Sequence, residues 1–444
     1  MRRYLSLLRQ RDFALLWGGA TISALGDGMS FVALLWLLIE RGGSATDVGL
    51  LAAIHTAPVI IGGIATGPIL DAFDPRRVLA ADNALRGVAM ASVPIAAAMG
   101  SLTTAHLFVV AAVYGLLFMT SAAGIPSLIT RLVKGDELIT ANAMESLSFS
   151  LSGLIGPGVA GLLIAFVGAP FVLAIDALTY FVFVGCLLAM RRGGKGEAPV
   201  AASEMETEPG AVPASTSKGL GPAVRFILSS APIVAITLFY MSVNVAGGIV
   251  TVVIPLYVRD VLLAGPETFG LLLSIITAGD LLGLLVVGAV NWRWPLGRSI
   301  AWALLSSGLV ILLWLLEPPV VVLCAVLFVW GALSSSLTPW AQTIRMRLIP
   351  PEMRGRVFAL LRTAMQSTRP IGAIAGGLLV ARGDLAVAIL AVGLLFAIPG
   401  FIGVWLPALG REPTADPLPG SAGPGTNVPV DRLDGATDGA ESPT

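Results

Sequence analysis

The chain contains twelve long apolar runs, and they constrain its fold more than any other feature. They span roughly residues 13–39, 48–70, 78–99, 104–129, 140–166, 170–190, 230–257, 268–290, 298–316, 320–344, 357–381 and 386–408. A helix needs about 20 mostly apolar residues to cross the hydrocarbon core of a bilayer. Backbone groups in lipid must bond to one another, and a β-barrel would show shorter, alternating segments. The sequence therefore predicts an all-α integral membrane protein with twelve transmembrane helices.

The composition agrees with a chain buried mostly in lipid. Apolar residues make up 56% of the chain and charged residues 12%, whereas soluble domains carry about 45–50% and about 25%. The net charge is zero, so no basic field points to a nucleic-acid partner. The sequence has no nucleotide-binding, zinc-protease or hydrolase motif, and its two cysteines and two histidines lie far apart. We therefore expect neither an enzyme nor a bound metal or cofactor.

Arginine and lysine residues are sorted between alternate loops. The loops of one side carry only Arg41, Arg259 and Arg382. The loops of the other side carry most of the basic residues, among them Arg76, Arg77, Arg131, Lys134, Arg191, Arg192, Lys195, Lys218, Arg293, Arg298, Arg345, Arg347, Arg354, Arg356 and Arg411. Basic loops mark the cytoplasmic side. The sorting predicts that both termini are cytoplasmic. The excess of arginine over lysine indicates a GC-rich bacterial source, so we expect the protein in the inner membrane of a bacterium.

Two segments break the apolar pattern and divide the chain. Residues 191–222 are rich in Gly, Pro, Glu, Ser and Ala, which predicts a flexible cytoplasmic linker. Residues 409–444 have a similar composition and predict a disordered cytoplasmic tail. We therefore expect two six-helix bundles, over residues 1–190 and 223–408.

The two bundles resemble each other in sequence. The second span opens with GLLAAI over residues 49–54, and the eighth opens with GLLLSI over residues 270–275. The letters GLL recur at residues 161–163 of the fifth span and at residues 377–379 of the eleventh. Together these matches favour a duplicated six-helix unit, a plan in which the substrate site lies between the repeats.

Two sequence motifs occur within this arrangement of two six-helix bundles. The loop after the second span reads GPILDAFDPRR over residues 67–77, and the fifth span reads SGLIGPGVAG over residues 152–161. By these motifs and its six-plus-six plan, the chain resembles the major facilitator superfamily. The loop matches the signature G-x-x-x-D-[RK]-x-G-[RK]-[RK] at Gly67, Asp71 and Arg76. The fifth-span motif is close to the exporter pattern G-x-x-x-G-P-x-x-G-G.

Other residues narrow the resemblance to one branch of that superfamily. RDF at residues 11–13, GDG at residues 26–28 and D-x-x-x-R-G over residues 82–87 resemble enterobactin-type siderophore exporters and macrolide efflux proteins. The arginine motif that many proton antiporters carry in the fourth span is absent from this sequence.

The resemblance implies roles for both motifs. The loop residues Gly67, Asp71, Arg76 and Arg77 would form a cytoplasmic gate. Asp71 would dock on the start of the eleventh span, near residues 354–357, where free N–H groups favour an anion, and the two arginines would pair with nearby acids. The alternative is a tight turn that only carries inside-positive charge. The fifth-span residues would let helices approach closely; they are Ser152, Gly156, Pro157, Ala160 and Gly161.

Ionisable residues inside the spans are functional candidates, because a charge at the bilayer centre costs from about 3 kcal/mol upward. Asp27 lies well inside the first span, and the resemblance places that span beside a central cavity. The proton-coupling candidates are Asp27, His55, Glu145 and Asp280. A purely structural role stays open for each. Asp82 and Arg86 lie four residues apart and are expected to satisfy each other.

A second set of polar residues is expected to line the cavity. Ser23 and Ser30 share a helical face with Asp27. The other cavity candidates are Tyr240, Asn244, Thr251, Ser335, Trp340, Arg362, Gln366 and Arg369. A pair between Arg369 and Asp280 is open, since both fall at a similar depth. Apolar walls with few polar groups suit an amphipathic organic substrate, and the arginines keep an acidic substrate open.

We expect a secondary active transporter that exports an amphipathic small molecule, such as a drug, a macrolide or a siderophore-like metabolite. Export would use proton antiport and alternating access. The alternative is an importer or a lysophospholipid-type transporter of the same fold. The expected partners are the small-molecule substrate, protons and the lipid bilayer, with no nucleic acid, and we expect a monomer.

Overall fold

The computed structural model describes residues 2–135, 137–191, 221–290 and 294–410. Helices make up nearly all of these segments, and no strand occurs within them. The predicted linker and tail fall almost wholly outside the described residues, which end at residue 191, resume at residue 221 and end again at residue 410. The all-α prediction is confirmed.

The first half of the chain folds into eight helices. They are α1 (Arg2–Arg9), α2 (Arg11–Glu40), α3 (Ala45–Thr56), α4 (Pro58–Ala72), α5 (Pro75–Ala98), α6 (Thr104–Leu132), α7 (Leu138–Val167) and α8 (Ala169–Ala189). Side-chain oxygens cap the starts of three of them: Ser44 caps α3, Asp74 caps α5 and Thr103 caps α6. Each cap satisfies a backbone N–H group that has no partner inside its helix.

The second half contains ten α-helices and two short 3₁₀ turns among the described residues. They are α9 (Gly221–Ser229), α10 (Ala231–Asp260), α11 (Pro266–Ala289), α12 (Leu296–Leu312), η1 (Leu313–Leu316), α13 (Val320–Ser335), α14 (Leu337–Leu348), η2 (Pro351–Met353), α15 (Arg354–Gln366), α16 (Thr368–Arg382), α17 (Leu385–Trp405) and α18 (Pro407–Gly410). Short helices thus precede the first long helix of each half, namely α1 before α2 and α9 before α10.

Three of the predicted spans are broken into two helices, and a proline explains each break. Pro58 begins α4 directly after the end of α3. Pro339 and Pro370 lie near the starts of α14 and α16. Proline has no N–H group, and its ring clashes with the carbonyl four residues earlier. In the second and third cases that carbonyl belongs to the last residue of the preceding helix, so the helix ends there.

Ten helices or helix pairs in the described part of the chain are long and apolar enough to cross a membrane. The two predicted spans that fall short are α5 and the pair α15–α16. Both carry arginines inside the apolar run, namely Arg86 in α5 and Arg362 and Arg369 in α15–α16. Both are helical and pack among the other long helices, so twelve spans remain the prediction and ten meet the hydropathy criterion.

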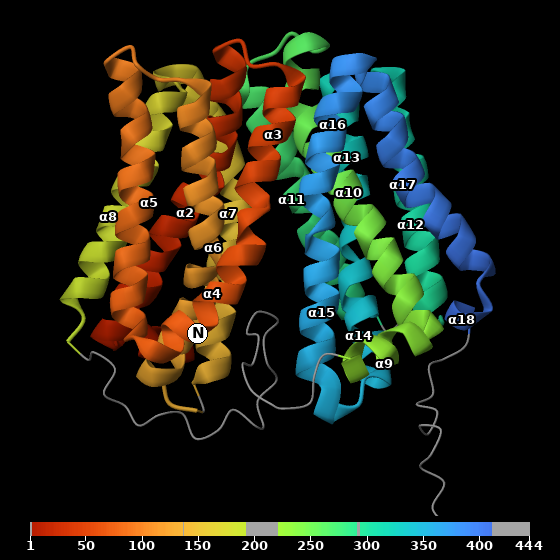
Figure 1. The fold of residues 1–444 in the computed structure, drawn as a ribbon, viewed down its shortest axis with the longest axis horizontal. Helices are drawn as coiled ribbons and strands as arrows, with labels where there is room; N and C mark the ends of the chain where they lie inside the picture. The colour runs from red at the N-terminus through yellow and green to blue at the C-terminus, as the bar shows by residue number, and fades with distance from the viewer. Residues whose placement is uncertain (1, 136, 192–220, 291–293, 411–444) are drawn as a thin grey trace, which may run out of the picture.

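The two halves form two bundles side by side (Figure 1). The edge that carries α1, the end of α8, α9 and α18 is called the lower edge here, and the opposite edge is the upper edge. Helices α2 and α10 both run from the lower to the upper edge, so Arg41 and Arg259 lie at the upper edge. The predicted linker ends and both described chain ends thus share one edge, as an even number of crossings requires.

The halves contact each other mainly toward the upper edge. Helix α3 packs against α16, and α7 packs against α11. At the lower edge α4 and α15, the continuations of α3 and α16, lie apart (Figure 1). This conformation is therefore closed at the upper edge and parted at the lower edge.

Candidate functional site

The interior of the first half holds a charged cluster built by α2, α5 and α8. Arg86 of α5 lies 2.6 Å from a carboxylate oxygen of Asp82 and 3.8 Å from one of Asp27 on α2. The predicted pair between Asp82 and Arg86 is confirmed. Asp176 of α8 is fully buried beside this cluster. Because α5 packs along α8, and α8 along α2, the three carboxyl groups come from three neighbouring helices.

Hydroxyl groups complete the cluster. Tyr180 donates to Asp27, and Ser30 donates to Asp176. Ser121 of α6 lies 2.5 Å from Arg86 and donates to Asp82 at 3.2 Å. The guanidinium also lies over an aromatic ring, 5.3 Å from the centre of Tyr180, a contact that stabilises a cation.

The charges of the cluster do not balance when all groups are ionised. Three carboxyl groups, those of Asp27, Asp82 and Asp176, face one guanidinium, that of Arg86. Buried unpaired charge is costly, so the cluster is neutral only when two of the three carboxyl groups hold protons. The Asp27 side chain is 22% exposed, whereas that of Asp82 is 2% exposed. Asp176 is fully buried, so Asp27 is the most exposed of the three carboxyl groups.

An aromatic path links this cluster to the second half. The ring of His55 on α3 stacks on Tyr114 of α6, with centroids 4.4 Å apart. Tyr114 in turn lies beneath the guanidinium of Arg86, 5.7 Å from its ring centre. On the other side, Arg369 of α16 is close enough to act electrostatically on His55. His55 thus lies between the carboxyl cluster of one half and an arginine of the other.

The polar stripe of the eleventh span faces the first half. Arg362, Gln366, Arg369, Ala373 and Gly377 follow one another at helical spacing, so they share one face. The upper part of this face touches α3, because a Cβ atom on Gly49 would lie 2.6 Å from the Ala373 carbonyl oxygen and 3.0 Å from the Gly377 Cα atom. Gln366 and Arg369, just below, are exposed. Arg369 therefore lies where the closed interface ends.

The fifth-span motif packs on two partners at once. Gly156 meets Gly28 of α2 within the same half, and the hydroxyl group of Ser152 donates to the Ala24 carbonyl of that helix. Gly161 meets the other half, where a Cβ atom on it would lie 2.4 Å from the Pro266 carbonyl oxygen. The motif thus joins α2 and α11 across α7. Ala160 is fully buried in the same helix.

These observations describe two similar helical bundles with ionisable groups near their interface, and comparison with known proteins agrees. The model of the transmembrane secretion effector family matches residues 3–421. The chain belongs to that family. Its fold and relatives are those of major facilitator transporters, so the protein is a multi-pass membrane transporter and not an enzyme.

Several curated relatives of this transmembrane secretion effector protein are efflux pumps by name. The multidrug efflux pump Tap of Mycobacterium tuberculosis is 27% identical over 405 residues, which cover 87% of this chain and 91% of that protein. The multidrug efflux pump Tap of Mycolicibacterium fortuitum is 27% identical over 411 residues, covering 89% and 95%.

Solved structures share the fold of the family. A mutant of the nucleoside transporter NupG superposes with a TM-score of 0.72 at 12% identity, covering 89% of this chain and 99% of that one. A bacterial homologue of the iron transporter ferroportin, in an inward-facing state, superposes with a TM-score of 0.66 at 18% identity, covering 90% and 99%. At these identities the likeness shows the fold alone.

The gate residues of this secretion effector chain are not engaged in the described conformation. Asp71 lies at the end of α4, is exposed, and has no hydrogen bond or ion pair within the described segments. The start of α15 lies away from α4 (Figure 1). The docking of Asp71 on that helix is therefore absent in this lower-open conformation, and its role in a gate stays a prediction. Gly67 lies inside α4 and Arg77 is exposed.

Arg76 has a different partner in this conformation, and its pairing with an acid in a closed gate stays a prediction. Its guanidinium donates to the carbonyl oxygens of Leu187 and Leu188 at 2.6 and 2.7 Å, instead of pairing with an acid. These carbonyls end α8, and the C-terminal end of a helix carries partial negative charge. Arg76 therefore holds α5 to α8 within the first half.

Two predicted cavity serines point into the bundle in this conformation. Ser23 and Ser30 are 5% and 1% exposed. Ser23 donates to Asn83 of α5 at 3.4 Å, and Ser30 donates to Asp176 of α8. They hold α2 to its neighbours, whereas Asp27 between them keeps partial exposure.

The cavity candidates of the second half are mostly bonded within that half. Tyr240 donates to Thr338 at 3.1 Å and lies under the guanidinium of Arg345 at 5.0 Å. Other candidates donate to carbonyls of their own helix: Asn244 to Tyr240, Thr251 to Gly247 and Ser335 to Ala332. Trp340 is 6% exposed.

The pair considered between Asp280 and Arg369 is not formed, since no hydrogen bond or ion pair joins the two within the described residues. The packing explains this, because Asp280 lies on α11, which contacts α7 and α13. Arg369 lies on α16, which contacts α3 and α10. A similar depth in the membrane is therefore not enough to make two side chains neighbours, because their helices pack against different partners.

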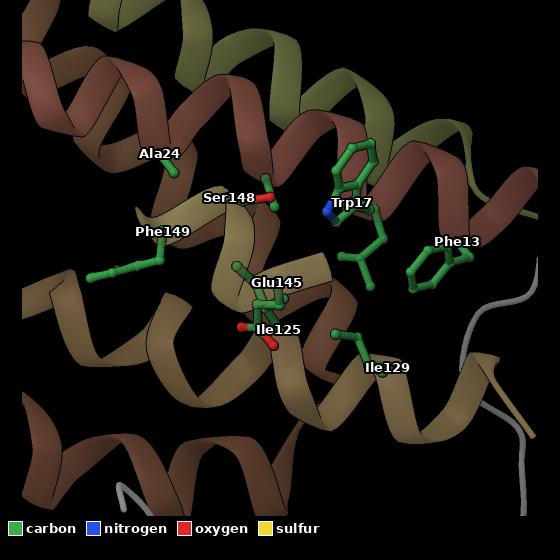
Figure 2. Close-up of a pocket in the computed structure, with 10 residues that line it drawn as sticks. Phe13, Trp17, Ala24, Ile125, Ile129, Glu145, Ser148 and Phe149 are labelled. Carbon is green, nitrogen blue, oxygen red and sulfur yellow. The ribbon is translucent and has the colours of Figure 1, made fainter. Parts of the chain in front are cut away.

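Glu145 lies apart from the charged cluster, in a small pocket between α2, α6 and α7. Phe13, Trp17 and Phe149 line much of this pocket, and Figure 2 shows the Glu145 carboxylate beside Ile125. The pocket lies in the lower part of the first half, toward the end of α6 and the start of α7. Glu145 and Asp27 therefore lie in different parts of the bundle.

Tyr114, Tyr180 and Ser121 join the charged cluster, although the sequence pattern does not single them out. One signal was available for α8. Asp176 and Tyr180 lie four residues apart in an otherwise apolar run, which places both on one helical face, as with Asp82 and Arg86.

Proposed function

We propose that this protein is a proton-driven exporter of amphipathic small molecules, with Asp27 as the residue that exchanges protons. The observation that carries the proposal is the partly exposed Asp27 carboxyl group at the edge of a buried cluster with more carboxyl groups than cations. Its relatives named as multidrug efflux pumps support the direction of transport.

The chemistry of the cluster supports a proton site. The Asp27 carboxyl group accepts a hydrogen bond from the Tyr180 hydroxyl and lies 3.8 Å from Arg86, and both contacts stabilise its ionised form. Burial beside further carboxyl groups stabilises its protonated form instead. Small changes in surroundings, such as the opening of one edge of the transporter, then shift the balance between the two forms.

Alternating access connects this site to export. The basic loops predict that the lower edge faces the cytoplasm. In the conformation open at this edge, substrate enters between the halves and Asp27 releases its proton. The halves then rock about the α3–α16 and α7–α11 contacts until the upper edge opens. Substrate leaves there and Asp27 takes up a proton. The protein works in the inner membrane with both termini in the cytoplasm, as a monomer of two six-helix bundles.

The test measures dye accumulation in a pump-deficient bacterium that expresses the wild-type chain, Asp27→Asn or the control Asp260→Asn. Asp260 is an exposed carboxylate paired with Arg259 at the upper edge. The dyes are one hydrophobic fluorescent cation, one zwitterionic dye and a labelled macrolide. We expect the wild-type and Asp260→Asn chains to lower accumulation of at least one dye by several-fold. A protonophore or Asp27→Asn should abolish the difference.

Two results would overturn the proposal. Export that survives both the protonophore and Asp27→Asn would exclude proton coupling through this residue. Higher accumulation with the wild-type chain than without it would indicate an importer, the alternative of the same fold. Western blots of isolated membranes establish equal expression of all chains.

A further inference from the structure

We propose that Arg369 binds an acidic group of the substrate at the apex of the space between the halves, so that the preferred substrates carry a carboxylate or similar anion. The inference rests on the proposed function, since it names the class of molecule that the transporter moves. It depends on a different residue, in the other half, from the one assigned to the proton.

Arg369 lacks a protein anion. Within the described segments, its guanidinium makes no ion pair and no hydrogen bond, although it lies inside a predicted span, where a charge is costly. Within its own half, Asp280 lies on α11, which packs mainly against α7 and α13, whereas α16 packs mainly against α10 and α3. In the first half, Asp27 already has Arg86 and Tyr180 as partners.

Arg345, an arginine buried in the second half, has different surroundings. Arg345 is 5% exposed, lies over the ring of Tyr240 at 5.0 Å, and contacts the sulfur atom of Met365 at 3.2 Å. It is enclosed by its own bundle. Arg369, by contrast, is exposed, on the face of α16 that looks toward the first half.

The place of Arg369 fixes where the ligand would bind. One helical turn above it, Ala373 closes against Gly49 of α3, which blocks the path to the upper edge. His55, on the helix α3 that packs against α16, lies between Tyr114 and Phe31, with ring centroids 4.4 and 4.6 Å away. A molecule that enters from the lower edge thus meets, at the end of its path, a free guanidinium beside a wall of aromatic rings.

These surroundings select an anion on an amphipathic molecule. A guanidinium binds a carboxylate through two parallel hydrogen bonds, a geometry that a neutral ester cannot match. The aromatic rings favour a flat apolar body next to that acid. When the lower edge closes, water leaves the apex, so a bound anion would also compensate the charge that Arg369 keeps there.

A pair of dyes that differ only in the acid tests the inference. The probes are a rhodamine with a free benzoate group and the methyl ester of the same rhodamine. Their binding to the purified full-length protein in detergent is measured by fluorescence anisotropy. We expect the free acid to bind roughly tenfold or more tightly than the ester, as a charge-assisted hydrogen bond requires.

Three variants locate the preference. Arg369→Gln should bind both dyes equally. Arg369→Lys should keep part of the preference for the acid, since lysine keeps the positive charge but cannot donate two parallel hydrogen bonds. Arg382→Gln is the matched control, because Arg382 is exposed at the other end of the same helix; it should behave like the wild type. Thermal unfolding without dye shows whether each variant folds, and Arg369→Gln should melt no lower than the wild type.

Several outcomes would overturn the inference. These are equal binding of acid and ester by the wild type, a preference that survives Arg369→Gln, no binding of either dye, or a melting point lowered by Arg369→Gln. The proposed function is judged separately, by the Asp27-dependent export. Export without an acid preference would leave proton-driven efflux standing and remove the role of Arg369.

Discussion

At the scale of single residues, Arg86 of the first half and Arg369 of the second half have opposite surroundings. The first half surrounds Arg86 with carboxylates, hydroxyls and aromatic rings. The second half leaves Arg369 without a protein anion among the described residues. Removing one partner of a buried ion pair is costly, because the other charge is left without compensation. The contrast is the basis for proposing a proton site at Asp27 and a substrate site at Arg369.

Arg86 should be essential for stability. Arg86→Gln would leave three neighbouring carboxyl groups without a cation, and breaking a buried ion pair from one side costs about 3–5 kcal/mol. We expect a clearly lower melting temperature for the purified protein in a thermal scan. The double variant Asp82→Asn with Arg86→Gln should recover part of the loss, since both charges are removed. An unchanged melting temperature for Arg86→Gln would contradict the cluster as described.

Arg76 and Arg77 offer a matched pair for a second test. Arg76 bonds two carbonyls at the end of α8, and Arg77 is exposed. Arg76→Gln should destabilise the protein by about 1–3 kcal/mol, as expected for hydrogen bonds from a charged group, and Arg77→Gln by less than about 0.5 kcal/mol. Chemical unfolding in detergent measures both. Equal effects of the two substitutions would show that the α8 contact contributes little.

At the scale of helices, close approach between backbones defines the upper interface. Gly161 of α7 and Gly49 of α3 lie against carbonyls of the other half, where a Cβ atom would come within 2.4 and 2.6 Å. Such distances leave no room for a side chain, so the helices themselves would have to move. Because the contacts join the two halves, that movement would open the upper edge.

Gly161→Val should therefore shift the transporter away from the described conformation. Spin labels on Thr46→Cys and Val380→Cys, at the upper ends of opposite halves, report the separation; both native cysteines are replaced by alanine in this background. We expect a longer distance in Gly161→Val. Gly153→Ala is the control, since a Cβ atom there meets only Thr277 at an ordinary 3.5 Å. An unchanged distance in Gly161→Val would argue against this interface as the closed gate.

At the scale of the whole molecule, the lower-open conformation explains why Asp71 makes none of the contacts predicted for the cytoplasmic gate. Asp71 can act only when α4 and α15 come together, and they lie apart here (Figure 1). A residue that works in one conformation contributes nothing to the stability of another. Its effect should therefore appear in transport and not in the unfolding of this state.

Asp71→Asn tests this view of the cycle. We expect its melting temperature to equal that of the wild type in detergent, while dye export falls several-fold because the lower edge closes less readily. Export is measured in the same pump-deficient strain. A variant that melts lower and exports normally would place Asp71 in the structure of the bundle instead of its gate.

The sequence by itself determined where the spans lie, because membrane spans are encoded by local runs of apolar residues. The breaks at Pro58 and Pro370, inside two predicted spans, appear only in the structure. The sequence also identified the Asp82–Arg86 pair, whose spacing is set within one helix. Such features depend on neighbours along the chain, which periodicity reveals directly.

Only the tertiary structure decided which polar groups meet across helices. Asp280 and Arg369 lie at a similar predicted depth, yet on helices that pack mainly against different neighbours, while Asp27 meets Arg86 and Tyr180 from two other helices. It also showed which edge is closed and that Arg369 lies just below that closure. These facts follow from the rotation of each helix about its axis and from the packing of the two halves, which residue spacing along one helix cannot specify.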